Sequence, residues 1–556
     1  MKILIGSRRY RYAAKLASFL IVVALIAGIA GCAGDGDGGP YTLTMAVAPP
    51  GSGTATDLTG ASPYAANTTV NITAAADPGY RFANWTAPAG AFGNQTATTT
   101  TFTMPAQNVM VTANFAALYD LTMAVAGGNG TATDLTNASP YTAGTPVSVQ
   151  AVADPGYRFV NWTAPDGTFG NQTATTTTYT MPAQNVTVTA NLAPFAGGSG
   201  TGGDPYQIAD WHQLHNVRNY MDSYFILVNN LDSNTAGYTE LANQTANSGK
   251  GWQPIGDYTS VNFTGTFDGQ GYEIKDLFIN RPSEDYVGLF GAVDVGGAVK
   301  NVGVVDGTVS GDWHVGGLVG RIDGIVSNSY STCNVTGYCV VGGLVGCNYG
   351  TASNCSAAGD VSASWRYAGG LAGINQGNVS SCYATGDVTG GGHTVGGLMG
   401  RSDESGTVDN CYSTGNVSGY TYVGGLMGEN RNTVSNSYST GKVNGNNGVG
   451  GLIGKNDGIV SNAYSTCNVT GSSGVGGLVG YNSDTVSNSF WDTQTSGQNS
   501  SAGGTGKNTT EMKDITTFSG ATWNITTVSG IGERNITYIW NIVDSVTYAF
   551  LSWQPV

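Results

Sequence analysis

The chain has 556 residues, a formal net charge of -15 and a charged fraction of 10%, whereas charged residues usually make up about 25% of a soluble protein. This length exceeds one compact core, so we expect several domains or an extended repeat structure. Nucleic acids and anionic membrane surfaces attract clustered Lys and Arg. The acidic balance, without such a cluster beyond the N-terminus, therefore excludes both as partners.

The N-terminus is typical of an export signal. Arg8, Arg9 and Lys15 precede an apolar stretch over residues 16–30. This stretch is shorter than the ~20 residues that span a bilayer, which disfavours an uncleaved anchor helix. The tetrad Ile29-Ala30-Gly31-Cys32 resembles a bacterial lipobox. The resemblance implies a lipoprotein signal over residues 1–32 and lipidation at Cys32, the sole membrane anchor. Residues 33–40 would form a flexible tether.

Two tandem units follow, predicted at residues 41–117 and 118–195. Alternating segments bounded by Pro-Gly turns, such as residues 109–115, indicate strands, so each unit is expected to be a small all-β domain. The phrase Gly79-Tyr80-x-Phe82-x-x-Trp85 and its copy ending at Trp162 resemble the divergent internalin-type B-repeat family. The resemblance implies surface-exposed spacer or adhesive modules without catalysis. We interpret both tryptophans as core residues.

Residues 196–285 are predicted to form an N-terminal cap and the first strands of a solenoid. Asp210 and Gln213 form a capping-box pattern at the start of a helix with one apolar face through Trp211. Such a helix can cover the open end of a solenoid. His212 and His215 lack a third metal ligand, so they are interpreted as surface or packing residues.

The phrase Val-Gly-Gly-Leu-Val-Gly organises residues 286–491. Its Leu recurs in steps of 26, 27, 27, 28, 26 and 26 residues, and a degenerate copy at 287–291 makes eight units. These leucines are Leu318, Leu344, Leu371, Leu398, Leu426, Leu452 and Leu478. Short strands in such uniform steps predict a parallel β-helix, in which equivalent residues stack in columns. The Gly pairs would permit either positive φ or close approach of successive coils.

Tyr330 and its equivalents in other units form one column of aromatic residues, and the direction of their side chains depends on Asn328. The equivalents are Tyr383, Tyr412, Tyr438, Tyr464 and Phe490. If Asn328 and its equivalents form a corner, the small residues Cys355, Cys382 and Cys411 point inward and the tyrosines form an outward ladder. If the strand continues straight, Val326 and Tyr330 share the inner face. We favour the corner.

These units resemble the GLUG motif family, through the Gly-Gly-Leu phrase and Asn-Cys-Tyr-Ser-Thr-Gly-Asn-Val at residues 410–417. The resemblance implies a β-helical binding or display module of bacterial surface proteins. Lipidation of Cys32 would leave seven cysteines, an odd number without a Cys-x-x-Cys motif. A disulfide framework is therefore not expected, although one bridge between Cys339 and Cys347 stays open.

Candidate catalytic carboxylates occur in the repeats. Asp360 and Asp387 occupy equivalent positions, but neighbouring units put Asn or Lys there, which is typical of an exposed turn. Asp403, Glu404 and Asp409 crowd an enlarged turn that we interpret as a solvated acidic loop. We predict no catalytic residue, no metal site and no cofactor.

Aromatic residues just before the Leu phrase form the candidate binding strip, because rings repeated along the coils could stack on sugar faces. The strip comprises Trp313, Tyr338, Trp365, Tyr367, Tyr420 and Tyr422. Residues 492–556, rich in aromatics from Trp523 onward, are expected to close the final coil as a C-terminal cap.

The sequence thus predicts a lipid-anchored bacterial surface protein of all-β class. It would act in adhesion, binding or display, with a glycan or surface protein as ligand. The alternatives are a polysaccharide lyase or hydrolase on the β-helix, and a purely structural envelope protein. The oligomeric state is not predicted.

Overall fold

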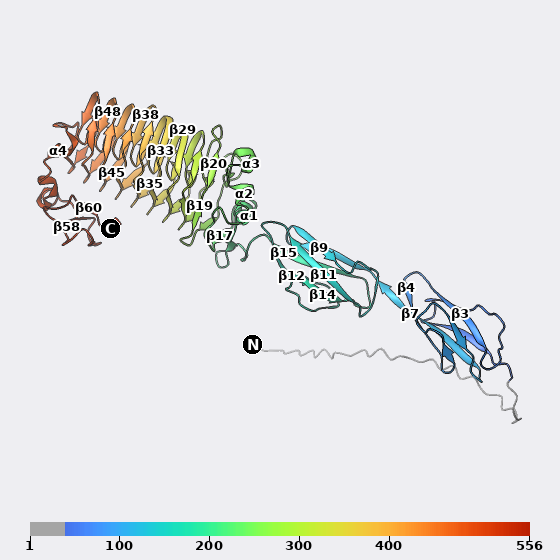
Figure 1. Cartoon of the computed structure of the whole chain (residues 1–556). Helices are drawn as coiled ribbons and strands as arrows, with labels where there is room; N and C mark the ends of the chain where they lie inside the picture. The colour runs from blue at the N-terminus through green and yellow to red at the C-terminus, as the bar shows by residue number, and fades with distance from the viewer. Residues whose placement is uncertain (1–38, 556) are drawn as a thin grey trace, which may run out of the picture. The chain divides into compact units, whose positions relative to one another are not determined.

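The computed structural model describes residues 39–555, so the predicted signal peptide, Cys32 and residues 33–38 of the tether lie outside the described residues. The described chain consists mostly of strands, as predicted (Figure 1). It divides into two compact units, one ending at Leu118 and the other beginning at Tyr119.

The first B-repeat-like unit is a pair of small sheets around a buried tryptophan. Trp85 is fully buried, and its Nε1 donates to the carbonyl oxygen of Ala97 at 3.0 Å. The predicted core role of Trp85 is therefore confirmed. One sheet contains β1 (Leu43–Ala48), β4 (Tyr80–Thr86) and β7 (Val109–Tyr119), and the other contains β2 (Gly53–Asp57), β3 (Thr69–Ala76), β5 (Ala91–Phe92) and β6 (Thr99–Thr103).

The second compact unit begins with a copy of this architecture. Trp162 is again fully buried, and its Nε1 donates to the carbonyl oxygen of Ala174 at 3.0 Å. Its sheets contain β8 (Leu121–Ala126), β12 (Arg158–Thr163) and β15 (Val186–Ala193), and β9 (Gly130–Asp134), β11 (Pro146–Ala153), β13 (Thr168–Phe169) and β14 (Thr176–Thr180).

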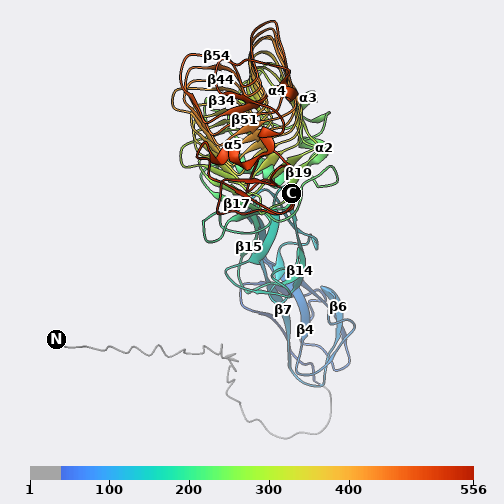
Figure 2. The ribbon, with the colours of Figure 1, turned by 90° about the vertical axis from the view of Figure 1, so that its left-hand side faces the viewer.

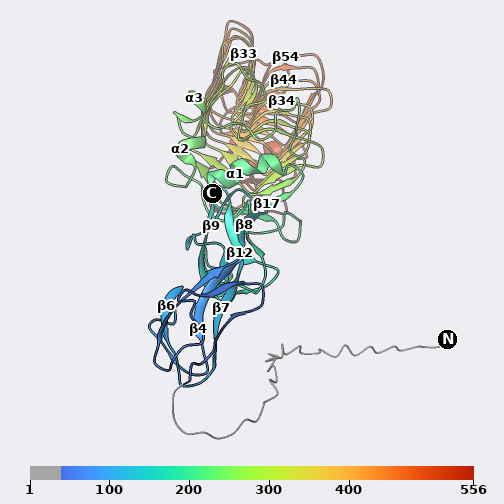
Figure 3. The ribbon, with the colours of Figure 1, turned by 90° about the vertical axis from the view of Figure 1, so that its right-hand side faces the viewer.

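A short helix covers the first end of the solenoid. α1 (Trp211–Asn216) begins at Asp210, whose Oδ1 accepts from the Gln213 N–H at 2.8 Å, as the capping-box pattern predicts. The apolar face contributes Trp211 and Leu214 to the solenoid core. The helix continues only as a 3₁₀ turn, Val217–Asn219. Figure 3 shows α1 lying across the end of the coils, with α2 (Tyr238–Leu241) and α3 (Ala246–Gly249) beside it.

Residues 273–491 form the predicted parallel β-helix. One coil consists of β26 (Val319–Ile322), β27 (Ile325–Ser327), β28 (Tyr330–Ser331) and β29 (Asn334–Gly342). Each strand pairs in parallel with its equivalent in the next coil, for example Val319 with Val345. In the last coil, the four continuous sheets contain β54 (Val479–Asn482), β55 (Val486–Ser487), β56 (Phe490–Asp492) and, on the β29 side, β53 (Ser473–Gly476).

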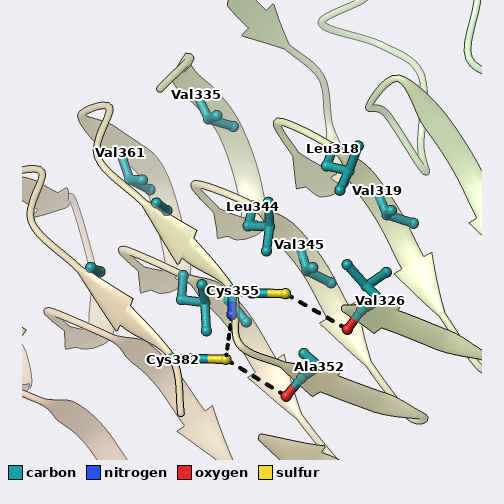
Figure 4. Close-up of a cluster of buried hydrophobic side chains, with 14 of the residues drawn as sticks. Leu318, Val319, Val326, Val335, Leu344, Val345, Ala352, Cys355, Val361 and Cys382 are labelled. Atoms are coloured by element: carbon teal, nitrogen blue, oxygen red, sulfur yellow. Dashed lines mark hydrogen bonds between the residues drawn. The ribbon is translucent and has the colours of Figure 1, made fainter. Parts of the chain in front are cut away.

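The interior is a set of stacked apolar columns. Leu318 lies above Leu344 and Val326 above Ala352 within one continuous buried cluster (Figure 4). The glycines of the repeated phrase have negative φ and serve close approach: a Cβ on Gly320 would lie 2.6 Å from the carbonyl carbon of Tyr286. Packing between coils therefore explains these glycines.

Asn328 and its equivalents form the predicted corner. All seven residues are left-handed, with φ between 46° and 55°, a conformation that Asn tolerates better than most residues. Cys355 and Cys382 consequently point into the core, where the Cys355 N–H donates to Cys382 Sγ (Figure 4). The tyrosines point away from that core. The seven equivalents are Asn328, Asn354, Ser381, Asn410, Asn436, Asn462 and Asn488.

The interior also holds an amide ladder that the sequence analysis missed. Asn430 Nδ2 donates to Asn456 Oδ1 at 2.7 Å, and Asn456 Nδ2 donates to Asn482 Oδ1 at 2.8 Å. Asn430 and Asn456 are fully buried. Because each amide is both donor and acceptor, the column satisfies itself along the coil axis.

The C-terminal aromatics do not close the final coil as we expected. The outward tyrosines Tyr383, Tyr412, Tyr438 and Tyr464, here called the tyrosine ladder, stack with ring centroids 4.9, 5.1 and 5.0 Å apart. Trp523 and Trp540 pack on this ladder. Figure 1 shows the segment labelled β58 and β60 below the coils, near their C-terminal end. Burial of these aromatic faces against the tryptophans favours docking of the segment at the ladder.

The last coil is closed instead by the segment directly after it. β57 (Thr505–Lys507) pairs with β56, and Trp491 joins the solenoid core. The segment on the ladder contains α5 (Ile515–Ser519), β58 (Ile525–Thr527), β59 (Trp540–Ile542) and β60 (Phe550–Leu551); Figure 2 shows α5 with α4 (Thr493–Ser496) from the C-terminal end of the coils.

Asn456→Leu should destabilise the solenoid, since it leaves the Asn430 donor and the Asn482 acceptor without their ladder partner. We expect a loss of about 1–3 kcal/mol in the free energy of unfolding, measured by urea denaturation. Asn444→Ala, on the exposed face, should stay within about 0.5 kcal/mol of wild type. Equal stabilities for the two variants would contradict the role of the ladder.

The tyrosine ladder should resist ionisation. Burial raises the pKa of Tyr438 and Tyr464 above the ordinary value, so the folded chain keeps them neutral while the unfolded chain ionises near pH 10. Their contribution to stability is present below that pH and is lost as the pH rises above it. A spectroscopic alkaline titration should show these tyrosines ionising together with unfolding.

Trp540→Ala removes a buried ring that lies 6.0 Å from Tyr438 and 5.9 Å from Tyr464. The substitution should lower the free energy of unfolding by about 3–5 kcal/mol. It should also shift tyrosine ionisation to lower pH and expose residues 508–555 to proteolysis. Tyr538→Ala, at an exposed site in the same segment, is the matched control; an unchanged titration in Trp540→Ala would contradict the packing role.

Candidate binding face

The structure brings three of the predicted strip residues together. Tyr338 and Trp365 stack with centroids 5.4 Å apart and an interplanar angle of 22°, and Trp313 lies 6.0 Å from Trp365. We call Trp313, Tyr338 and Trp365 the aromatic ledge. Tyr338 is 45% exposed, whereas the two tryptophans are partly buried beneath and beside it. The ledge therefore presents a supported, solvent-facing ring.

The rings meet at a bulge in the strand pairing, where Tyr338 stands opposite both Ser364 and Trp365. Trp313 in β25 (Trp313–Gly316) pairs with Cys339 in β29, and Cys339 pairs with Arg366 in β33 (Val361–Gly369). Cys339, Val340 and Cys347 form a small apolar cluster outside the solenoid core, and Trp313 and Trp365 pack over it. The ledge thus has its own apolar support.

Two of the other predicted strip residues, Tyr420 and Tyr422, separate from the ledge. Tyr420 is 57% exposed, and Tyr422 packs edge-on against Tyr481 at 6.4 Å, with Lys455 Nζ 5.6 Å from its ring. The intervening coil has Gly391-Gly392-His393 where its neighbours carry rings. The row is therefore interrupted there.

Tyr367 lies at a second left-handed corner, immediately before the Val-Gly-Gly-Leu phrase. The equivalent residues His314, Val340, Thr394 and Tyr422 also have φ between 53° and 68°. Positive φ is strained for β-branched residues such as Val340 and Thr394. In the last two coils the position is Gly448 and Gly474.

A polar cleft of about 510 Å³ lies beside this corner. We call it the polar cleft. It is lined by Gln376, Arg401, Asp403, Glu404, Ser405 and Arg431. The cleft arises from a lengthened turn. Asn375 and Asn378 pair with Ser402 and Thr407 of the next coil, so that coil inserts two extra residues between paired positions.

Ion pairs fix the arginines of the cleft. Arg401 Nε donates to Asp403 Oδ1 at 2.5 Å, and Arg431 Nη2 lies 2.9 Å from Glu429 Oε1. Burial opposes the charge of Arg431, but the hydrogen bond and charge of Glu429 outweigh it and raise the arginine's pKa. Glu404 is exposed on the turn. Within the acidic loop predicted from sequence, Asp403 is thus neutralised by Arg401 and Arg431, whereas Glu404 is not paired with either of them.

Gln376, Arg401 and Arg431 were not predicted from the sequence as members of a site. A signal was available, because charged pairs two residues apart recur after the Leu phrase: Arg401-x-Asp403, Glu429-x-Arg431 and Lys455-x-Asp457. Their positions on successive parallel strands place these pairs side by side.

The remaining acidic candidates are held by structural interactions. Asp360 Oδ1 accepts from the backbone N–H of Asp387, and Asp387 Oδ1 accepts from that of Asn416, at 3.0 and 2.8 Å. The side-chain acceptor recurs where the column carries Asp or Asn, whereas after Lys442 the N–H of Asn468 donates to the Gly441 carbonyl oxygen instead.

The histidine candidates also have a structural explanation. Burial, with the charges of Arg218 and His212, lowers the pKa of His215 to about 4. Within residues 39–555, no three His, Cys, Asp or Glu side chains are placed to hold a metal ion.

The cysteines of the solenoid are buried thiols. Cys339 and Cys347 are both free, so the bridge left open by the sequence is not formed. Burial raises the pKa of the Cys339 thiol to about 11 and that of Cys347 to about 12.

Comparisons with known proteins agree with both family resemblances. The divergent InlB B-repeat domain matches residues 41–118 and 119–195, and the GLUG motif matches residues 366–389 and 391–418. The GLUG matches fall on the coils that carry Tyr367 and Arg401. The structure extends the same coil geometry to both sides of them.

Two curated proteins share part of the chain. It is 37% identical over 144 residues to a candidate Gly-rich membrane protein of Evansella cellulosilytica, and 34% identical over 154 residues to halomucin of Haloquadratum walsbyi. The matches cover 25% and 27% of this chain but only 16% and 2% of those proteins. The chain therefore spans a small part of the curated relatives it matches.

Two solved structures show distant likeness. A candidate immunoglobulin A1 protease from Bacteroides ovatus is 22% identical, with a TM-score of 0.38 over 65% of this chain and 96% of that one. An IgA1 protease is 14% identical, with a TM-score of 0.32 over 68% of this chain and 25% of that one. Likeness at this level does not bear on activity.

The thiols beneath the ledge should be unreactive in the folded protein. Because thiolates are the reactive form, Cys339 and Cys347 should remain unmodified by an alkylating reagent at neutral pH and react fully in denaturant. Peptide mass spectrometry after timed labelling measures both sites. Rapid labelling of the native protein would contradict their burial.

Proposed function

We propose that this chain is a bacterial envelope protein that binds a glycan through the aromatic ledge. The observation that carries the proposal is the 45% exposed Tyr338 ring, stacked on Trp365 and flanked by Trp313. Aromatic faces supported in this way bind sugar rings with little loss of side-chain freedom. The protein would act in adhesion or display.

Placement at the cell surface is supported by the names of two partial relatives, a Gly-rich membrane protein and halomucin. The B-repeat units would hold the β-helix away from the envelope. No helix within residues 39–555 is long and apolar enough to cross a bilayer. Lipidation of Cys32 would supply the anchor and remains a prediction from the signal sequence.

Tyr338→Ala and Trp365→Ala should each weaken glycan binding about tenfold, or about 1.4 kcal/mol, since each removes a face or its support. Tyr420→Ala is the matched control, because Tyr420 is 57% exposed but lies outside the ledge. The measurement is a glycan array with the full chain, followed by calorimetry on the strongest ligand. Equal affinity in all three variants and wild type would refute binding at the ledge.

A further inference from the structure

The aromatic ledge and the polar cleft are parts of one surface. We propose that the cleft is a second subsite for the same ligand, so that the chain binds a neutral oligosaccharide extended along several coils. This inference rests on the proposed glycan-binding function and adds the length and charge class of the ligand.

Tyr367 connects the two parts. Its ring packs on the cluster of Cys339, Val340 and Cys347 that also supports Trp313 and Trp365. Its hydroxyl accepts from Arg401 Nη1 at 2.8 Å, and the Arg401 guanidinium lies 5.1 Å from the ring centroid. A ligand that leaves the ledge over Tyr367 therefore meets the cleft directly.

The register of the strands gives the length of the ligand. Trp313 and Arg321 belong to one coil, and Arg321 aligns with Cys347, Ile374, Arg401 and Glu429 in the four coils that follow. Four coil steps of about 4.8 Å correspond to about 19 Å. A ligand that reaches from Trp313 to Arg431 must therefore contain several sugar residues.

The charges of the cleft favour a neutral ligand. Arg401 already pairs with Asp403, and Arg431 with Glu429, so neither guanidinium is an open carboxylate site. Glu404 forms no ion pair among the described residues and adds a negative charge at the rim. A uronic acid would be repelled there. Sugar hydroxyls can instead donate to the carboxylate of Glu404 and to the amide oxygen of Gln376.

Polar contacts inside the cleft keep it open in one arrangement. Gln376 Nε2 donates to Asp403 Oδ2 at 3.2 Å and to the Tyr349 hydroxyl at 3.3 Å. Ser405 Oγ donates to the carbonyl oxygen of Gln376 at 2.7 Å, which ties the lengthened turn to the preceding coil. Little ordering is then needed when a ligand binds, which favours affinity.

The test measures affinity against ligand length by calorimetry, with neutral oligosaccharides from disaccharide to hexasaccharide of the best array ligand and a uronate series beside them. In the wild type, affinity should rise about tenfold with length and then level off. Glu404→Ala should abolish this gain while leaving disaccharide binding unchanged. Glu240→Ala, at an exposed carboxylate on α2, should behave as wild type.

The outcomes separate the two proposals. Affinity independent of length, or a Glu404→Ala effect equal for short and long ligands, overturns the second subsite while Tyr338→Ala still reports on the ledge. Tighter binding of uronates than of neutral ligands overturns the charge class. Absence of binding by any glycan overturns the proposed function together with this inference. Thermal unfolding of each variant confirms that the solenoid stays folded.

Discussion

Backbone hydrogen bonding between coils in strict register is the constraint on which this solenoid depends. Each strand pairs only with its equivalents in the coils before and after it, so a residue in one coil lies directly against its equivalent in the next. A side chain that suits one coil must therefore suit its own copies. The buried leucines, the interior amides and the stacked tyrosines all meet this requirement.

This constraint made much of the fold predictable from one sequence. The period around Leu318 and Leu344 indicated the coil, and the small residues that follow the Asn corner, such as Cys355, indicated which side chains point inward. The capping of α1 by Asp210 followed from local chemistry. In each case the deciding interaction lies within one coil, within one turn of helix or between equivalent positions.

The parts that could not be predicted depend on contacts without periodicity. Trp540 reaches Tyr438 from about a hundred residues away in sequence, and the apolar content of the C-terminal segment does not reveal which exposed surface it covers. The cleft is a similar case, because the lengthened turn between Ser402 and Thr407 that forms it occurs in one coil and not in the coil before it. Three of the six strip residues meet in the ledge at a bulge in the strand pairing, whereas Gly391 and Gly392 interrupt the row.

The residues at the left-handed corner beside the ledge make the two ends of the solenoid different. Coils that bear Tyr367, Thr394 or Tyr422 there hold a side chain in an unfavourable backbone conformation, and the two final coils relieve it with Gly448 and Gly474. The earlier coils of an otherwise uniform stack thus have strained, differing side chains at this corner. The two coils nearest the C-terminus have glycine there instead. A nearly periodic scaffold can in this way mark one region of its surface. A partner that binds along the coils meets these individual side chains over only part of their length.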